Sequence, residues 1–161
     1  MDCILLGTSG YPPLLAAIPD PPPRLWFRGR AELLHKTCVA VIGARHASQD
    51  GLSAAGDIAF GLAQARVVVV SGLARGVDSA AHRAALDVGG DTIAVLGTGV
   101  DRVYPPENRD LSERIAERGV LVTEFPPGSP PEDWLFPGAI ASSAASPRRW
   151  WWSKPERRVV R

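Results

Sequence analysis

Two arginines, Arg45 and Arg75, stand in glycine-containing turns that each follow an apolar run and precede a segment with helical spacing. The clearer case is Val67–Asp78, in which a run of valines ends in the turn Ser71–Gly76. Such a run is typical of a strand that is buried on both faces of a parallel sheet. The first amides of the following helix have no partner within it and lie at the positive end of the helix dipole, so they form an anion site. With the guanidinium of Arg75 added, this turn is predicted to hold phosphate.

Other chemistries find less support in the sequence. The first loop, Gly43–Ser48, lacks the Gly-x-Gly-x-x-Gly fingerprint of dinucleotide sites, and Arg45 occupies the position of the second glycine. Asp78 and His82 are four residues apart, which we interpret as a pair on the surface of a helix. Ser71 lacks the Gly-x-Ser-x-Gly elbow that exposes a hydrolase serine. No cofactor is predicted, and the chain is not expected to be an enzyme.

Strands are predicted where β-branched and other apolar residues cluster, at 38–42, 67–70, 92–96 and 120–123. Helices are predicted from the spacing of apolar residues at 51–65, 76–87 and 108–118. The strict alternation requires crossover connections, so the predicted fold class is α/β with a doubly wound parallel sheet. Asn108 is expected to cap the third helix.

The loops after the first three strands are expected to meet at one rim. The carboxyl ends of parallel strands share an edge of the sheet, and ligands of open α/β sheets bind there. Arginines and helix amides along that rim would suit a polyanion, and an aromatic residue beyond it, Phe136 or Trp134, would stack a base for about 1–3 kcal/mol. The predicted DNA- or phosphate-binding residues are Gly43, Arg45, Ser48, Ser71, Gly72, Arg75, Gly76, Gly97, Thr98, Gly99 and Phe136.

The composition is that of a globular chain, with 161 residues of which 45% are hydrophobic and 22% charged. No apolar run has the length of a membrane span and no signal peptide is recognised, so a cytoplasmic location without a membrane partner is expected. Cys3 and Cys38 offer no disulfide framework and share no ligand spacing with the histidines, so no metal site is predicted. From Pro147 onward basic residues prevail, while the rest of the chain carries more acid than base. A nucleic-acid site in that part must therefore be a local cluster.

Several ordered motifs resemble the signature of the DNA-processing protein A (DprA/Smf) family. They are Val41–Ser48, Ser71–His82, Thr92–Asp101 with Tyr104–Asn108, Glu124–Gly128 and the segment Tyr11–Gly29. The resemblance implies a Rossmann-like domain in a bacterial cytoplasmic protein that binds single-stranded DNA without cleaving it. It further implies a homodimer that protects incoming DNA and helps load the RecA recombinase during natural transformation. By position, Arg45, Gly72, Arg75 and Gly76 would lie in the DNA pocket, with Phe136 at its mouth.

The resemblance stops after Phe136 and Pro137. The family continues with Arg-Asn-Arg-Ile-Ile, whereas this chain reads Gly-Ala-Ile-Ala-Ser. If suitable codons are assumed for the residues after Pro137 and the reading frame is shifted by one base, the translation becomes the family sequence. In the shifted frame, Arg148–Ser153 reads Ala-Ala-Val-Val-Val-Val. We therefore predict that one nucleotide was lost just after codon 137, and that residues 138–161 form an out-of-frame, disordered tail rich in basic residues and tryptophan. The rival interpretation is a basic and aromatic DNA-binding tail.

This hypothesis divides the chain into a proline-rich N-terminal arm (1–34) with a short strand at 25–28, a partial Rossmann-like DNA-binding domain (35–137) and the tail (138–161). It predicts a domain that is incomplete on its C-terminal side and a protein whose function is impaired. The sheet would lack a central strand, and Val120–Thr123 would then have an unpaired edge. Two other functions stay open. One is a nucleotide-processing, phosphoribohydrolase-like enzyme, whose glycine-rich loop is matched only in part by Gly97–Gly99. The other is an interaction protein without a ligand.

Overall fold

The computed structural model describes residues 1–131 and 159–160. Its strands are β1 (Asp2–Leu5), β2 (Arg24–Gly29), β3 (Cys38–Val41), β4 (Val68–Ser71), β5 (Thr92–Val95), β6 (Val120–Thr123) and β7 (Val159–Val160). Its α-helices are α1 (Pro13–Ala16), α2 (Gln49–Gln64), α3 (Val77–Asp87) and α4 (Arg109–Arg118), and its 3₁₀ helices are η1 (Ala31–His35) and η2 (Pro106–Asn108). Within the described residues the strands form one sheet in the order β1-β2-β6-β5-β4-β3-β7.

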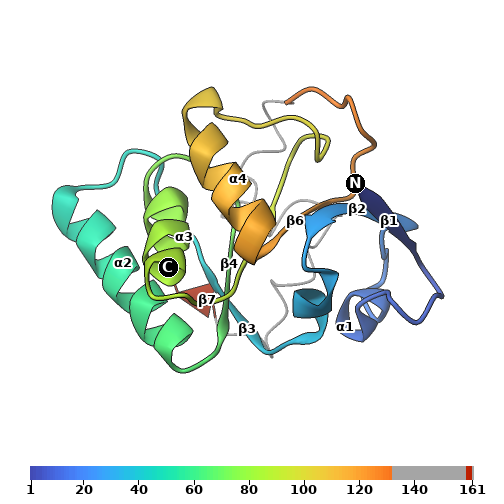
Figure 1. Ribbon diagram of the computed structural model, residues 1–161, viewed down its shortest axis with the longest axis horizontal. Helices are drawn as coiled ribbons and strands as arrows, with labels where there is room; N and C mark the ends of the chain where they lie inside the picture. The colour runs from blue at the N-terminus through green and yellow to red at the C-terminus, as the bar shows by residue number, and fades with distance from the viewer. Residues whose placement is uncertain (132–158, 161) are drawn as a thin grey trace.

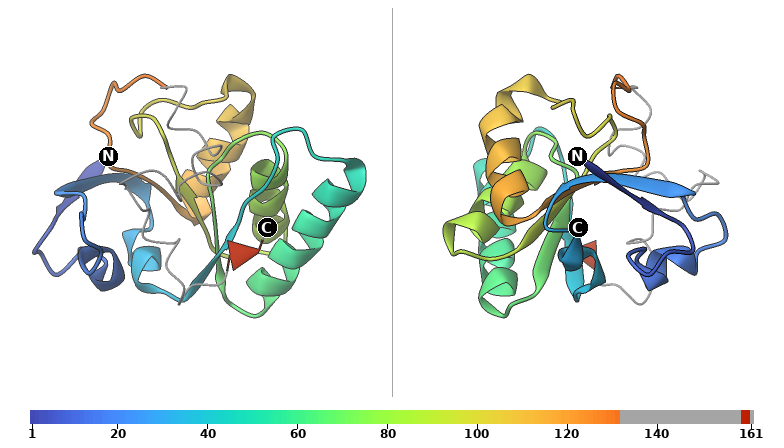
Figure 2. Two further views of the ribbon diagram at one scale, coloured as in Figure 1. Left: turned by 180° about the vertical axis from the view of Figure 1, so that it is seen from behind. Right: turned by 45° about the vertical axis from the view of Figure 1, so that its right-hand side comes forward.

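The centre of the sheet is the parallel series β3, β4, β5 and β6, whose strands lie side by side in chain order. The helices α2, α3 and α4 make the three crossovers. Because each crossover is right-handed and each new strand is added on the same side of the last, the three helices cover one face of the sheet (Figure 1 and Figure 2). The predicted Rossmann-like α/β fold is confirmed. The other face is covered by the N-terminal helical segments α1 and η1 rather than by a second set of crossover helices (Figure 2).

The N-terminal segment is part of the sheet. β2 pairs antiparallel with β6, with Trp26 opposite Thr123, and β1 pairs antiparallel with β2. The predicted strand at 25–28 is therefore present, whereas β1 was not predicted. The expectation that Val120–Thr123 has an unpaired edge is wrong, because β2, which belongs to the N-terminal segment, pairs with that strand.

The far edge of the parallel series is β3. Its partner is β7, which runs parallel to it with Val159 opposite Ala40. The predicted tail otherwise lies outside the described residues, and so does Phe136. In the part of the chain that the structure describes, no helix has the length and apolarity to span a membrane. That part also contains no group of three or more His, Cys, Asp or Glu side chains arranged to hold a metal ion.

The core is divided by the sheet, because successive side chains of a strand point to opposite faces. In β4, Val68 and Val70 pack against the N-terminal segment, and Val69 packs against the helices. On the helix side, the core between α2, α3 and the sheet is formed mainly by small residues, which allow the two helices to approach closely, and these are Ala55, Ala59, Ala63, Ala81 and Ala85. The part of that side next to α4 contains larger residues, among them Leu86, Leu111, Ile115 and Leu121. The opposite side contains larger residues of the N-terminal segment, and these are Tyr11, Leu15, Ile18, Leu25, Leu33 and Leu34.

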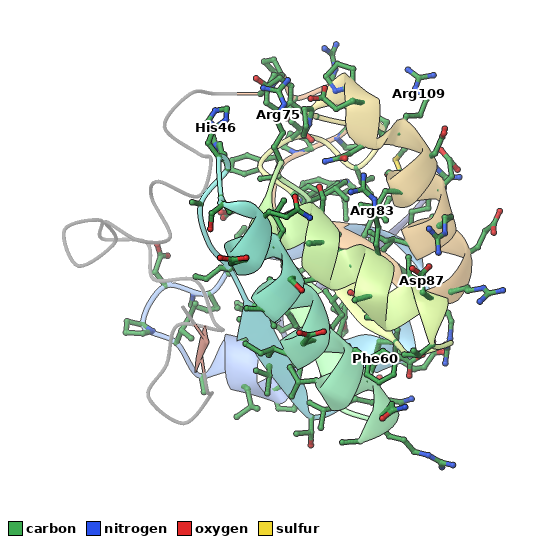
Figure 3. The ribbon with its side chains drawn as sticks, turned by 90° about the vertical axis from the view of Figure 1, so that its left-hand side faces the viewer. His46, Phe60, Arg75, Arg83, Asp87 and Arg109 are labelled. Carbon is green, nitrogen blue, oxygen red and sulfur yellow. The ribbon has the colours of Figure 1, made fainter. Side chains whose placement is uncertain are left out.

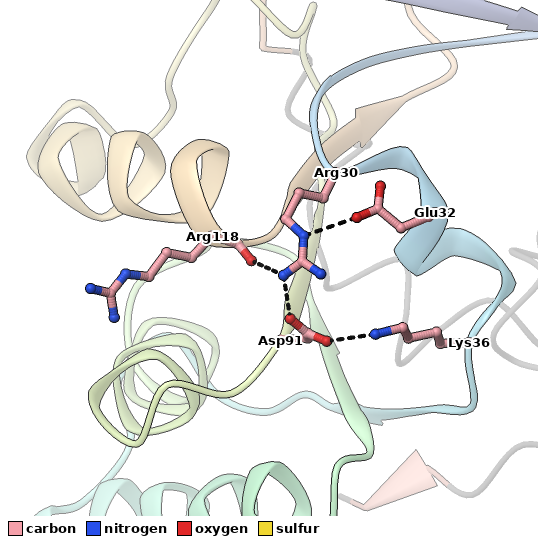
Figure 4. A network of polar contacts seen from close by, with 5 residues as sticks. All are labelled: Arg30, Glu32, Lys36, Asp91 and Arg118. Carbon is pink, nitrogen blue, oxygen red and sulfur yellow. Dashed lines mark hydrogen bonds and ion pairs between the residues drawn. The ribbon is translucent and has the colours of Figure 1, made fainter.

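A polar network fastens the N-terminal segment to the edge of the sheet where β5 begins (Figure 4). The Arg30 guanidinium donates to Asp91 at 2.7 Å and to the Arg118 carbonyl oxygen at 3.1 Å. It also donates to Glu32 at 3.0 Å, and Lys36 donates to the second Asp91 oxygen at 3.0 Å. The side chains of Arg30 and Lys36 are 41% and 47% exposed, so solvent and salt screen the network; it contributes little to the free energy of unfolding and mainly fixes how the segment enters the sheet.

Replacing Leu33 tests whether the N-terminal segment is structural. Leu33 is fully buried on η1 in the core cluster of the face opposite α2–α4, so Leu33→Ala is expected to lower the free energy of unfolding by about 2–5 kcal/mol. Leu14→Ala on α1 is the matched control, because Leu14 is 50% exposed and its truncation should cost less than about 1 kcal/mol. Urea titrations followed by circular dichroism measure both values. Equal, small losses would mean that the segment is not part of the cooperative core.

Candidate functional site

The loops after β3 and β4 are packed backbone to backbone at the carboxyl edge of the sheet. The Val77 amide donates to the carbonyl oxygen of Ala44 at 3.3 Å. A Cβ atom placed on Gly76 would lie 2.3 Å from the same oxygen and 2.7 Å from the Arg45 carbonyl oxygen. The two loops that contain Arg45 and Arg75 are thus brought together, as predicted. Arg75 and His46 lie at the same end of the molecule in Figure 3.

Two glycines make this close approach possible. Gly76 has φ 76° and ψ −127°, a conformation that side-chain-bearing residues rarely adopt, and it immediately precedes α3. A Cβ atom on Gly43 would lie 2.8 Å from Cγ2 of Val77. Gly43 therefore gives space to the first residue of α3, and Gly76 gives space to the backbone of the neighbouring loop. Both predicted site glycines shape the rim.

Arg75 is the best-defined cation of the rim. Its Nε donates to a carboxylate oxygen of Glu107, and the two side chains are 53% and 51% exposed. The hydrogen bond from Arg75 lowers the pKa of Glu107, and the same bond raises the pKa of the guanidinium. Because both side chains are about half exposed, the ion pair contributes little to stability, and another anion can reach the guanidinium. Arg45, on the adjacent loop, is exposed as well.

The amides of the turn after β4 are partly used by an internal carboxylate. Oδ2 of Asp78 accepts hydrogen bonds from the Gly72 amide at 3.1 Å and from the Ala74 amide at 3.4 Å. Asp78 is fully buried, and this burial raises its pKa, while the amide hydrogen bonds act in the opposite direction. The anion bound by these two amides is therefore the side chain of Asp78. Phosphate binding at this turn would depend chiefly on Arg75.

Asn108 holds the same turn from the other side. Its buried Nδ2 donates to the Leu73 carbonyl oxygen and to Oγ of Ser79, each at 2.9 Å, and Ser79 Oγ donates to the Ala74 carbonyl oxygen at 2.6 Å. The prediction that the Asn108 side chain caps the third helix is wrong. Asn108 occupies the N-cap position of α4, but its side chain makes no capping hydrogen bond there because it reaches into the turn.

The hydroxyl groups among the predicted site residues all have partners within the fold. Ser71 Oγ donates to the Val41 carbonyl oxygen at 2.7 Å and is buried. Ser48 caps α2 by accepting from the Gly51 amide at 3.2 Å. Thr98 Oγ1 donates to the Arg102 carbonyl oxygen at 2.8 Å. These residues build the rim, and a direct contact between them and a ligand stays a prediction.

The turn Gly97–Gly99 joins the rim to the loop after β6. The Gly99 amide donates to the Ser129 carbonyl oxygen at 3.1 Å. A Cβ atom on Gly99 would lie 2.6 Å from a carboxylate oxygen of Asp101, and that carboxylate accepts from the Gly128 amide at 2.8 Å. Gly97 is half-buried at the start of the turn. The close packing at Gly99 explains why a glycine stands there.

An aromatic residue of the rim was not assigned a role from the sequence. Tyr104 is 38% exposed and lies near enough to Arg75 to contribute to the raised pKa of that guanidinium. An exposed ring beside a cation is a common feature of single-strand binding surfaces. Its position in the Tyr104–Asn108 motif could have indicated this role. The predicted stacking residues, Phe136 or Trp134, both lie outside the described residues.

Asp78 and His82 do not form the surface pair that their spacing suggested. Both are fully buried, because α3 packs on the sheet between α2 and α4. The Thr92 hydroxyl donates to the Val69 carbonyl oxygen at 2.8 Å, so Nδ1 of His82 must donate to that hydroxyl, 2.7 Å away. Burial lowers the pKa of His82 to about 3, so the imidazole is neutral at physiological pH. His82 is therefore a core residue that links α3 to β5.

The fold and the rim together define a Rossmann-like domain with cationic loops at the carboxyl edge of its sheet. A family model described as DNA recombination-mediator protein A matches residues 2–139. The chain belongs to this family.

Relatives agree with this assignment. Protein Smf of Synechocystis is 44% identical over 79% of this chain, and the DNA processing protein DprA of Streptococcus pneumoniae is 42% identical over 79% of it. The chain spans 33% and 45% of their respective lengths, which is less than half of either.

Solved structures of the family have the same fold. The S. pneumoniae protein superposes with a TM-score of 0.79 at 39% identity, covering 85% of this chain and 48% of that one. DNA processing protein A of Helicobacter pylori, described for its single-stranded DNA binding mode, superposes with a TM-score of 0.74 at 29% identity, covering 84% of this chain and 61% of that one.

Gly76→Ala tests the loop contact at the rim. Gly89 is the matched control, since it also has a positive φ, of 71°, but a Cβ atom there would meet nothing within 4 Å. Gly89→Ala should cost only the backbone term of about 1–2 kcal/mol. Gly76→Ala should cost more, because its backbone conformation is unfavourable for alanine and because the loops after β3 and β4 must also move apart. Chemical denaturation measures the difference. Equal losses would show that the loop contact is not tight.

The buried His82 predicts a dependence of stability on pH. Its folded-state pKa of about 3 lies below the unfolded value near 6.5, so only the unfolded chain takes up this proton between those values. The free energy of unfolding should fall as the pH falls below about 6.5, with a limiting slope of about 1.4 kcal/mol per pH unit from this group. The raised pKa of Asp78 acts in the opposite direction at lower pH.

Urea titrations between pH 7.5 and 5 measure this slope. His82→Gln should flatten it, and His46→Gln, on the exposed loop after β3, should leave it unchanged. If His82→Gln does not fold, the wild-type imidazole can be followed by NMR. Titration of that imidazole with a midpoint near 6.5 would contradict its buried, neutral state.

Proposed function

We propose that this chain is a single-stranded DNA-binding domain that contacts the sugar-phosphate backbone through Arg45 and Arg75. The observation that carries the proposal is the backbone contact of the two loops at Gly76, which brings two exposed arginines to neighbouring positions on one rim. Two phosphates of one flexible strand can reach such a pair. The solved structure of the H. pylori relative is described for its single-stranded DNA binding mode, which supports the same choice of ligand.

Tyr104 gives the rim its second component. A ring beside Arg75 can stack on a base whatever its identity, and base stacking on an aromatic side chain contributes about 1–3 kcal/mol. Binding through phosphates and stacking needs no base-edge hydrogen bonds, so we expect little sequence preference. We propose further that the DNA is held without being cleaved, because the buried His82 and Asp78 have no access to a strand on the rim.

The wider role follows the family. We propose that the chain acts in the cytoplasm in DNA uptake by natural transformation, protecting incoming strands, pairing with a second copy and helping to load RecA. Its affinity is expected to be lower than that of the S. pneumoniae relative. The cations that the family has after Phe136-Pro137 are replaced here by Gly138–Ser142.

Salt titration tests the phosphate contacts. Binding of a fluorescent oligothymidylate, measured by anisotropy from 50 to 300 mM NaCl, should weaken with a slope of about −0.7 per phosphate contacted. Arg45→Ala and Arg75→Ala should each weaken binding and reduce the magnitude of that slope by about 0.7.

Arg83→Ala on α3 removes the same charge from an exposed site away from the rim (Figure 3), and it should leave the slope unchanged. The oligonucleotide should be recovered intact on a denaturing gel. If Arg45→Ala, Arg75→Ala and Arg83→Ala all have the same salt slope, the rim is excluded as the binding site.

A further inference from the structure

We propose that Glu107 is a built-in competitor for DNA phosphate at Arg75, and that its carboxylate limits how tightly the rim binds a strand. This inference rests on the proposed function, because it requires Arg75 to be a phosphate contact. It assigns to an acidic residue of the rim a part in setting affinity and in choosing between ligands.

The ion pair joins the turn after β4 to the 3₁₀ helix η2. Nε of Arg75 donates to a carboxylate oxygen of Glu107, and both side chains are about half exposed. A carboxylate and a phosphate both accept hydrogen bonds from the same forked edge of a guanidinium. Glu107 therefore occupies the Nε side of the guanidinium, which is one of the positions in which a phosphodiester oxygen could be bound.

The backbone next to Glu107 is fixed relative to Arg75. Asn108 is buried, and its side chain donates to the Leu73 carbonyl oxygen in the turn after β4 and to the Ser79 hydroxyl on α3. Leu73 lies two residues before Arg75, and Glu107 lies directly before Asn108. The carboxylate is thus held near the guanidinium by buried hydrogen bonds, whereas the ion pair itself is exposed and readily exchanged.

A ligand must displace this carboxylate to use Arg75 fully. Exchange of one anion for another at a single guanidinium gains little, so an isolated phosphate should bind poorly. A strand that also reaches Arg45, on the adjacent loop, can gain a second contact. The arrangement therefore favours a polyanion over mononucleotides and free phosphate. Removing the carboxylate should tighten binding without changing the number of phosphates contacted.

The test is a double-mutant cycle on oligothymidylate binding at 100 mM NaCl. Glu107→Gln and Glu107→Ala should each tighten binding by about two- to fivefold, the range of an exposed ion pair, with the salt slope unchanged. Glu117→Gln, at the other end of α4, removes the same charge from an exposed residue and should have a smaller effect because salt screens it. In the Arg75→Ala background, Glu107→Gln should no longer tighten binding.

The outcomes separate the two proposals. If the wild-type chain does not bind the oligonucleotide at low salt, or if Arg75→Ala binds as the wild type does, the proposed function fails at this residue. If Arg75→Ala weakens binding but Glu107→Gln tightens it no more than Glu117→Gln does, Glu107 is not a competitor. Equal tightening by Glu107→Gln with and without Arg75 would overturn the inference as well. Thermal unfolding of each variant shows that the fold is intact.

Discussion

The packing of Gly76 against the backbone of Ala44 and Arg45 constrains everything else at the rim. At 2.3 Å from the Ala44 carbonyl oxygen there is no room for a Cβ atom, and the conformation of Gly76 is one that other residues rarely adopt. Because the loops touch, two arginines that are far apart in the sequence become neighbours. The distance between the two arginines that a nucleic-acid strand would contact therefore depends on Gly76 having no side chain.

The groups that hold the rim are buried, and the groups that would meet a ligand are exposed. Asp78, Ser79 and Asn108 lie in the interior and bond the polar backbone of the turn after β4, while Arg75 and Glu107 reach into solvent. Buried hydrogen bonds are costly to leave unmade, so they fix geometry. Exposed ion pairs are weak and exchange easily. This division lets the turn stay ordered while its outer surface changes partners.

Local patterns were sufficient for the parallel part of the fold. The strand and helix positions, their alternation and the meeting of Arg45 and Arg75 at one edge all follow from apolar spacing and from the geometry of crossovers. The rest depends on contacts between distant segments. Asn108 has the sequence position of a helix cap, and only the neighbouring turn shows why its side chain is used elsewhere. Likewise, the spacing of Asp78 and His82 indicates a shared helix face but not that this face is buried.

The pairing of β2 with β6 has a consequence for how the chain acquires its structure. Trp26 lies opposite Thr123, so the antiparallel pair of β1 and β2 has no neighbour on one edge until β6, the last strand of the central parallel series, has been synthesised. Pairings between such distant segments form slowly, since a long loop must close before any contact offsets its entropy. Until then the apolar side chains that β2 buries in the folded protein, such as Leu25, are uncovered, and exposed apolar surface of this kind favours self-association of a nascent chain.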